Sequence, residues 1–475
     1  MKKNCVHIIG IVGQLSAPLA VALKKKGWKI TGSDQEKTFP PLTDHLIKNG
    51  IDWSQGYRKE NIKKSIDLVI IAGSALRSDP NNPEVKEAKK TGLKIISQAQ
   101  AIEKFVIRKN SVVVAGTFGK TTTTGMIVSI FNKSSKGPSY MIGGVPVNKT
   151  SPLQIKDSDW SIVEGDEYPT LGFDSNSKFL YYHPKFLVLT SARWEHQDIF
   201  KKESDYINTF KKVVNLVPKS GFILASEKGE NIEKILNKFS GKKYYYAVNK
   251  SNKTDFWAEK INYTNKGATF YLCGKTIKKP IKVEACVYGQ HNVENSVAAS
   301  SLALLNGISE KDVSFGIKKF KGIKKRLEFI GKYKNVSIIS DISQTKPRIL
   351  AALKAAKKHF KRNLWVVFYP HYSGLQEKES LFDYQNTFND ARQVIITKVI
   401  FRKDIKKGKR VSGSDIVRTI NSCKKNSLYV PVDDQVVEIL STKTKPGDII
   451  IFMSSGDYRE ILKNTINKLK RRGDD

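Results

Sequence analysis

A short glycine-rich segment carries the residues of this chain that are best suited to chemistry. Residues 116–121 read GTFGKT, directly after the apolar, β-branched run Ser111–Ala115 and directly before a threonine-rich segment that can begin a helix. A glycine-rich turn between a strand and a helix surrounds phosphate oxygens with backbone N–H groups, and the helix N-terminus adds its positive dipole end. In this pattern Lys120 reaches the β- and γ-phosphates of a nucleotide, and the Thr121 hydroxyl binds Mg²⁺.

The spacing is shorter than that of the common phosphate loop GxxxxGK[ST], because Val114 occupies the position of the first glycine. A loose cluster of Gly, Lys and Thr is more often an ordinary turn. Here the strand-like run before it and the four threonines after it favour phosphate binding. We therefore predict an ATP-dependent enzyme whose nucleotide contacts come from Gly116, Thr117, Gly119, Lys120, Thr121 and Thr122.

Acidic side chains follow a second apolar run, Trp160–Glu164, in the sequence EGDEY (residues 164–168). Carboxylates gathered near a phosphate loop are costly unless they bind a cation, so Glu164 is the best candidate for a Mg²⁺ ligand. The alternative is a solvated acidic turn. A third run, Phe186–Thr190, precedes His196, which is either a further metal ligand or a structural histidine.

Two other segments carry side chains that suit a nucleotide. In GQHNVEN (residues 289–295), the asparagines can contact an adenine edge, although helix capping alone would explain Asn292. In KKRLE (residues 324–328), Arg326 can bridge to phosphate when domains close, whereas the alternative is a basic surface run.

The N-terminus combines a basic start with an apolar run, which resembles a signal peptide. We favour instead a strand, a glycine loop and a helix, because Gly10 and Gly13 interrupt the run and a second strand-like run, Trp28–Thr31, follows. With Ser33 and Asp34 after that second run, this is a nucleotide-type arrangement, although it lacks a full GxGxxG.

The order of strand-like and helix-like runs divides the chain into three blocks, residues 1–109, 110–317 and 318–475. Strands alternate with helices in the first and third blocks, which predicts parallel sheets with crossover helices. The fold class is therefore α/β, with a Rossmann-like N-terminal domain, a central ATPase-type domain with the phosphate loop, and a Rossmann-like C-terminal domain. Hairpins are expected over 256–287 and a helix over 292–305.

Composition limits the class of protein. At 475 residues and 40% hydrophobic content, the chain is expected to fold into several globular domains. Its four cysteines have no metal-ligand spacing and no apolar run is long enough to span a bilayer, so we expect a cytoplasmic protein without a membrane partner. The net charge of +37 raises the alternative of a nucleic-acid-associated ATPase. The lysines are spread along the chain and lack interleaved aromatic residues, so no nucleic-acid partner is expected.

Taken together, the motifs resemble the Mur ligase family, the ATP-dependent amide ligases of peptidoglycan assembly. The resemblance covers the chain in order, through HIIGIVG…TGSD, GTFGKTTT, EGDEY, GQHNVEN, KKRLE and DISQTKP. It implies a substrate, UDP-N-acetylmuramate, whose carboxylate is joined to an amine. The tripeptide L-alanyl-γ-D-glutamyl-meso-diaminopimelate is the first expectation for the amine and L-alanine is the second. A monomer or homodimer is expected.

The resemblance also implies roles. The γ-phosphoryl group of ATP moves to the carboxylate, and the amine then displaces phosphate from the acyl phosphate. Lys120 would hold the γ-phosphate, Thr121 and Glu164 one Mg²⁺, and Glu164 with His196 a second. The nucleotide would contact His291, Asn292 and Asn295, Arg326 and Asp341 would close the third domain on the site, and UDP would contact Gly10, Gly13, Ser33 and Asp34.

Three positions depart from the family pattern. Phe118 and Gln344 stand where the family usually has His, and Arg193 stands near the position of an acidic residue. Glutamine forms hydrogen bonds but cannot carry the charge of an imidazolium. The departures leave three alternatives open: a different amine substrate, a slow enzyme, or a degenerate nucleotide-binding paralogue. Because Lys120, Thr121, Glu164 and His196 are all present, we expect an active enzyme.

Overall fold

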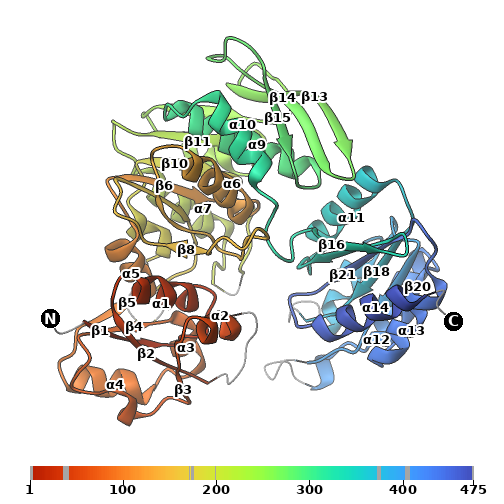
Figure 1. The fold of residues 1–475 in the computed structure, drawn as a ribbon, viewed down its shortest axis with the longest axis horizontal. Helices are drawn as coiled ribbons and strands as arrows, with labels where there is room; N and C mark the ends of the chain where they lie inside the picture. Colours follow the sequence, from red (N-terminus) through yellow and green to blue (C-terminus); the bar gives the residue numbers. More distant parts are fainter. Residues whose placement is uncertain are drawn as a thin grey trace. The chain divides into compact units, whose positions relative to one another are not determined.

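The computed structural model describes residues 4–35, 42–170, 172, 176–197, 199–371, 376–401 and 407–472, which form three β-sheets with flanking helices (Figure 1). This architecture confirms the predicted α/β class with three domains.

The first sheet has the strand order β3-β2-β1-β4-β5 and is parallel throughout. Its strands are β1 (Cys5–Ile9), β2 (Lys29–Asp34), β3 (Ser54–Gln55), β4 (Leu68–Ile71) and β5 (Ile95–Ser97). The helices are α1 (Ser16–Lys25), α2 (Leu42–Lys48), α3 (Gly73–Ser78), α4 (Pro83–Lys90) and α5 (Gln98–Phe105), with a 3₁₀ turn, η1, at Lys59–Asn61. The first strand is entirely buried, so the N-terminal run forms a core strand, as predicted.

The second sheet has the order β15-β14-β13-β12-β11-β10-β6-β9-β7-β8. Its strands are β6 (Asn110–Ala115), β7 (Ser139–Met141), β8 (Leu153–Gln154), β9 (Trp160–Glu164), β10 (Phe186–Leu189), β11 (Phe222–Ser226), β12 (Lys243–Tyr246), β13 (Phe256–Thr264), β14 (Gly267–Gly274) and β15 (Ile281–Ala285). The helices are α6 (Lys120–Lys133), α7 (Glu203–Val214), α8 (Ile232–Leu236), α9 (Gln290–Leu305) and α10 (Glu310–Lys319), with η2 at Lys178–Tyr182.

Parallel pairing of three buried strands brings the candidate site together. Strand β6 lies between β9 and β10, with Val114 opposite Glu164 and Ala115 opposite Leu189. Segments that follow parallel strands meet at the carboxyl edge of their sheet. The phosphate loop, the acidic segment and the segment with His196 therefore leave the sheet at the same edge.

The third sheet has the order β16-β17-β21-β18-β19-β20, and only the β16–β17 pair is antiparallel among the described pairings. Its strands are β16 (Glu328–Tyr333), β17 (Val336–Asp341), β18 (Leu364–Phe368), β19 (Gln393–Ile396), β20 (Ser427–Tyr429) and β21 (Ile449–Met453). The helices are α11 (Lys346–Phe360), α12 (Gly413–Cys423), α13 (Asp433–Lys443) and α14 (Arg459–Arg471), with η4 at Lys378–Tyr384 and η5 at Lys407–Lys409.

By its internal contacts the chain forms two compact units. The first comprises Met1–Lys260, Phe270–Glu284 and Val293–Phe320, and it holds the first sheet and most of the second. The second comprises Ile261–Thr269, Ala285–Asn292 and Lys321–Asp475. Among the helices of the described residues, none has the length and apolar character needed to cross a bilayer.

Candidate active site

Two glycines shape the phosphate loop. Gly116 has φ +136°, and a Cβ added there would collide with the Thr190 hydroxyl and lie 2.6 Å from the Ser191 carbonyl oxygen. Gly119 precedes α6 with φ +81°, in the left-handed region that favours glycine. Gly119 is the N-cap residue of α6 and has no side chain that could cap the first turn. The N–H groups at this helix end suit a phosphate, and their contact with ATP stays a prediction.

Lys120 begins α6 and forms an ion pair with a buried carboxylate. Its Nζ lies 2.7 Å from Oε2 of Glu167, and the two side chains are 14% and 1% exposed. Burial alone would lower the pKa of the Lys120 ammonium, but the neighbouring carboxylates, with Glu167 first, raise it above its usual value. Burial would likewise raise the pKa of Glu167, yet Lys120 and His196 hold it well below its usual range. Both groups are therefore charged at neutral pH.

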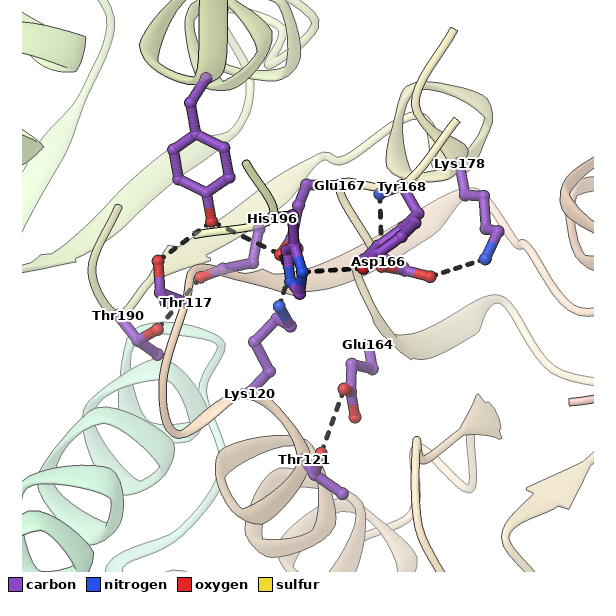
Figure 2. Close-up of polar contacts among 12 residues, drawn as sticks. Thr117, Lys120, Thr121, Glu164, Asp166, Glu167, Tyr168, Lys178, Thr190 and His196 are labelled. Atoms are coloured by element: carbon purple, nitrogen blue, oxygen red, sulfur yellow. Dashed lines mark hydrogen bonds and ion pairs between the residues drawn. The ribbon is translucent and has the colours of Figure 1, made fainter. Parts of the chain in front are cut away.

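Glu167 also binds two further site residues through its second oxygen. Figure 2 shows Glu167 and His196 close to the ammonium group of Lys120. Tyr206, which also reaches Glu167, belongs to α7. His196 Nε2 lies 3.3 Å from Glu167 Oε1, and the Tyr206 hydroxyl donates to the same oxygen at 3.4 Å. The Tyr206 hydroxyl is also 3.0 Å from the hydroxyl of Thr117 in the phosphate loop. One buried carboxylate thus connects the loop lysine, the histidine and the loop itself.

Thr121 and Glu164 form a separate pair at the start of α6. The Thr121 hydroxyl donates to Glu164 Oε1 at 3.0 Å (Figure 2). Glu164 Oε2 accepts from the backbone N–H of Gly143 at 2.9 Å. These are hard oxygen donors, and Mg²⁺ in nucleotide sites takes one or two such protein ligands and completes its shell with phosphate and water. The pair fits a Mg²⁺ ion that arrives with ATP. Within the described ranges no three His, Cys, Asp or Glu side chains gather as they would for a resident metal.

His196 is less directly suited to the metal role that the resemblance implies. Its Nε2 faces Glu167, and its Nδ1 lies 2.7 Å from the Tyr168 hydroxyl, so both ring nitrogens already have partners. The residue has φ +60°, a conformation that is uncommon for residues other than glycine, although histidine adopts it more often than most. The structure therefore joins His196 to Glu167 and Tyr168, and a contact between His196 and Mg²⁺ requires one of these partners to be exchanged.

The residues predicted to contact the nucleotide belong in part to the first compact unit and in part to the second. A Cβ at Gly119 would lie 2.6 Å from Oδ1 of Asn295. Asn295, which was predicted to contact the nucleotide, therefore packs against the phosphate loop. The Ser191 hydroxyl is buried and has no hydrogen-bond partner in the described part of the chain. The remaining predicted ATP contacts, His291, Asn292, Arg326 and Asp341, belong to the second unit.

Three of those four residues differ in their surroundings within their own unit. Asn292 is buried and donates to the Tyr288 carbonyl at 2.6 Å, whereas His291 is exposed. Asp341 is buried and accepts from the N–H groups of Leu327 and Ser343, and burial raises its pKa. Their contacts with ATP remain predictions.

In the first domain, the glycine loop at residues 10–13 forms hydrogen bonds with the end of β2. The N–H of Gly10 donates to the Ser33 carbonyl at 2.8 Å, and the N–H of Val12 donates to Asp34 Oδ2 at 2.9 Å. The N–H of Gly13 donates to the Gly10 carbonyl. The structure thus brings the predicted UDP residues together.

The Ser33 side chain has a structural role. Its hydroxyl is fully buried and donates to Glu84 at 2.5 Å, and Glu84 also faces His7 at 3.2 Å. The Ser33 side chain therefore points into the domain interior, so that its backbone carbonyl, and not its hydroxyl, contacts the glycine loop.

The three departures occupy different settings. Phe118 is half-buried in the phosphate loop. The Arg193 guanidinium lies 3.7 Å from Glu230 at the surface, and its carbonyl accepts from the Thr117 hydroxyl at 2.7 Å. Gln344 is buried, and its Oε1 accepts from the backbone N–H of His371 at 3.0 Å. At each of these positions the side chain or backbone is accommodated by the fold.

Sequence reasoning missed Glu167 and Tyr206. The exposure of residues 163–168 alternates, with Val163, Gly165 and Glu167 buried and the residues between them partly exposed. This alternation has the period of two that a strand has, and it continues past the end of β9 to the buried Glu167. The burial is a property of the folded chain, and the segment EGDEY by itself does not select Glu167 among its three carboxylates. Tyr206 offered no signal, because it is simply an aromatic residue on the buried face of a helix.

Three segments of the chain match family models in order along the sequence. Residues 5–110 match the model described as the Mur ligase family, catalytic domain, and residues 114–303 match the Mur ligase middle domain. Residues 325–456 match the Mur ligase, glutamate ligase domain.

Known proteins are similar to this chain over most of its length. The UDP-N-acetylmuramate–L-alanine ligase of Acetivibrio thermocellus is 30% identical over 458 residues, which cover 96% of this chain and 94% of that protein. The structure of the UDP-N-acetylmuramate-alanine ligase from Thermotoga maritima superposes with a TM-score of 0.77 at 21% identity, covering 98% of each chain. The UDP-N-acetylmuramate:L-alanyl-γ-D-glutamyl-meso-diaminopimelate ligase from Neisseria meningitides gives a TM-score of 0.60 at 27% identity, covering 68% of this chain and 99% of that one.

Proposed function

The chain belongs to the Mur ligase family, and we propose that it joins the carboxylate of UDP-N-acetylmuramate to the amino group of L-alanine. As a member of that family it is an ATP-dependent ligase of peptidoglycan synthesis. The arrangement of Lys120 with the Thr121–Glu164 pair at the mouth of the phosphate loop carries the proposal, because it suits transfer of a γ-phosphoryl group to a carboxylate.

The choice of L-alanine departs from the first expectation drawn from the motifs, which was the tripeptide. The full-length relative at 30% identity acts on L-alanine by its name, which supports the alternative more strongly. The likeness to the Neisseria meningitides ligase at 27% identity keeps the tripeptide as the second candidate.

The site residues have distinct tasks in this reaction. A carboxylate oxygen of the substrate attacks the γ-phosphorus, the bond to the β-phosphate oxygen breaks, and ADP leaves. The amine then attacks the acyl carbon, loses a proton, and phosphate departs with the oxygen that came from the carboxylate. Lys120 neutralises the charge on the transferred group, and the N–H groups at the start of α6 hold the phosphates.

Mg²⁺ would be held by Thr121 and Glu164, where it would offset phosphate charge. Glu167 keeps Lys120 charged and aimed at the loop mouth, and it fixes His196 on its other side. Residues 1–109 bind the UDP portion, residues 110–317 bind ATP, and residues 318–475 bring Arg326, Asp341 and the amine.

Release of ADP tests the proposal. The full-length protein is incubated with ATP, Mg²⁺ and UDP-N-acetylmuramate, and L-alanine or the tripeptide is added separately. Turnover with L-alanine alone supports the proposed function, and turnover with the tripeptide alone would replace it with the second candidate. Absence of turnover with both amines, in protein that still binds ATP, would favour a degenerate paralogue marked by Phe118, Arg193 and Gln344.

A further inference from the structure

The helix α3 lies where the first domain should bind its ligand. Strands β1 and β2 lead toward one edge of the first sheet and β4 and β5 toward the other, so the strand order reverses between β1 and β4. Ligands of open α/β sheets bind at such a reversal, beyond the carboxyl ends of the strands. Helix α3 begins two residues after β4, and a Cβ at Gly10 would lie 2.7 Å from Cβ of Ala72 and 3.3 Å from Cβ of Ala75. The predicted UDP loop therefore packs against the start of α3.

The last turn of α3 touches the catalytic segment of the central domain. Cζ of Arg77 lies 5.7 Å from the ring centroid of Tyr168, whose hydroxyl is 2.7 Å from His196 Nδ1. Next to it, Leu76 packs so closely on Gly172 that an added Cβ would collide with its side chain. Tyr168 thus lies in contact with both Arg77 and the site residue His196.

Arg77 has no ion-pair partner among the described residues. Its side chain is exposed and forms neither a hydrogen bond nor an ion pair with any residue in the described ranges. By contrast, Lys120 is paired with Glu167 and Lys178 with Asp166. A guanidinium with open donors matches the two oxygens of a carboxylate or phosphate, and it does so better than an ammonium.

We propose that Arg77 binds an oxyanion of UDP-N-acetylmuramate and so guides the acid from the first domain to the phosphate loop. The inference rests on the proposed function, since that substrate must reach from the UDP loop to the γ-phosphate. The substrate offers two such groups, its diphosphate and its carboxylate. Arg77 contacts Tyr168, and Tyr168 is hydrogen-bonded to His196 beside the phosphate loop. This position favours the carboxylate, because the carboxylate is the group that reacts with the γ-phosphate.

The test compares Arg77→Met, Arg77→Lys and the wild type in calorimetric binding and in steady-state turnover. Arg471→Met is the matched control, because Arg471 is an exposed arginine of α14 with no partner in the described residues. We expect Arg77→Met to weaken binding of UDP-N-acetylmuramate about tenfold or more, the effect of losing a charged hydrogen bond. The KM for ATP and the melting temperature should stay unchanged, and Arg77→Lys should recover part of the affinity.

Binding of UDP-N-acetylglucosamine, which has the diphosphate but no carboxylate, identifies the group. Weakening for UDP-N-acetylmuramate alone assigns Arg77 to the carboxylate, and equal weakening for both ligands assigns it to the diphosphate. Unchanged affinity of Arg77→Met for both ligands, while the wild type binds them, overturns the inference and leaves the proposed function intact. A wild type that does not bind UDP-N-acetylmuramate contradicts the proposed function, and the inference falls with it.

Discussion

The substitution Glu167→Gln separates the ion-pair network from the rest of the site. The amide keeps the shape of the side chain and removes its charge. Lys120 then loses the partner 2.7 Å away, and His196 loses the carboxylate 3.3 Å away. If Glu167 holds these two groups for catalysis, turnover should fall even where ATP still binds.

The geometry sets the size of the effect. Removing one partner of a fully buried ion pair costs about 3–5 kcal/mol. Because 14% of the Lys120 side chain reaches solvent, water offsets part of that loss, and we expect about 2–3 kcal/mol. For a domain of this size that corresponds to a fall in melting temperature of roughly 5–10 °C. If the same free energy is lost from the transition state, kcat falls about 30- to 140-fold, since each 1.4 kcal/mol is a factor of ten.

The assay measures kcat, the affinity for ATP and the melting temperature with and without ATP. Glu167 and the γ-phosphate compete for Lys120, so ATP should bind the variant at least as tightly as the wild type and stabilise it more. Asp166→Asn is the matched control, because Asp166 belongs to the same segment but is 38% exposed and paired with Lys178. Its kcat should stay within about threefold of the wild type, since exposed pairs contribute at most about 1 kcal/mol.

A kcat of Glu167→Gln equal to that of Asp166→Asn would refute the positioning role. So would a variant that loses ATP affinity in proportion to kcat, because that would mean that Glu167 serves the fold of the loop and not the alignment of Lys120.

Three further substitutions test the phosphate loop and the first domain. Lys120→Ala should abolish ADP release while UDP-N-acetylmuramate binding by calorimetry stays nearly unchanged, and loss of both would show that the domain roles are wrongly assigned. Gly116→Ala should abolish ATP binding, because its Cβ would meet Thr190 and its φ of +136° is strained for alanine; retained nucleotide affinity in a fluorescence titration would contradict the described loop. Glu84→Gln should destabilise the first domain at pH 7 but less at pH 3. Burial raises the pKa of Glu84, but hydrogen bonds from His7, Asn61 and Ser33 lower it more. The stabilisation is therefore present above the unfolded pKa of about 4.3 and is lost as the pH falls toward the folded value. Denaturant titrations of both proteins at the two pH values check this, and an equal difference at both would exclude the effect.

Much of the fold was predictable because buried parallel strands are short apolar runs with clear ends. The predicted strand Trp160–Glu164 coincides with β9 and Leu364–Phe368 with β18, and the phosphate loop stands between β6 and α6 as expected. Strand β12 was not predicted, because KYYY has lysine and tyrosines in place of an aliphatic run and is only partly buried. The sequence also did not predict that segments 261–269 and 285–292 belong to the second compact unit. Their assignment depends on packing between elements that are distant in the sequence.

The placement of the candidate site residues was predictable where it follows from their position along the chain. Glu164 ends a strand beside the loop and Thr121 begins a helix, so their proximity follows from the sheet. The partner of Lys120 depends on the backbone direction after β9, which three carboxylates in four residues do not specify. The Ser33 hydroxyl turned inward because Glu84, 51 residues away, needs a donor in the interior.

Isotope transfer tests the central claim most directly. UDP-N-acetylmuramate labelled with ¹⁸O in its carboxylate is incubated with the protein, ATP, Mg²⁺ and L-alanine, and the released phosphate is analysed by mass spectrometry. Activation of the carboxylate by the γ-phosphoryl group predicts one ¹⁸O atom in each phosphate formed. Unlabelled phosphate would show that water attacks ATP instead, and the account of this site as an acyl-activating ligase would then be wrong.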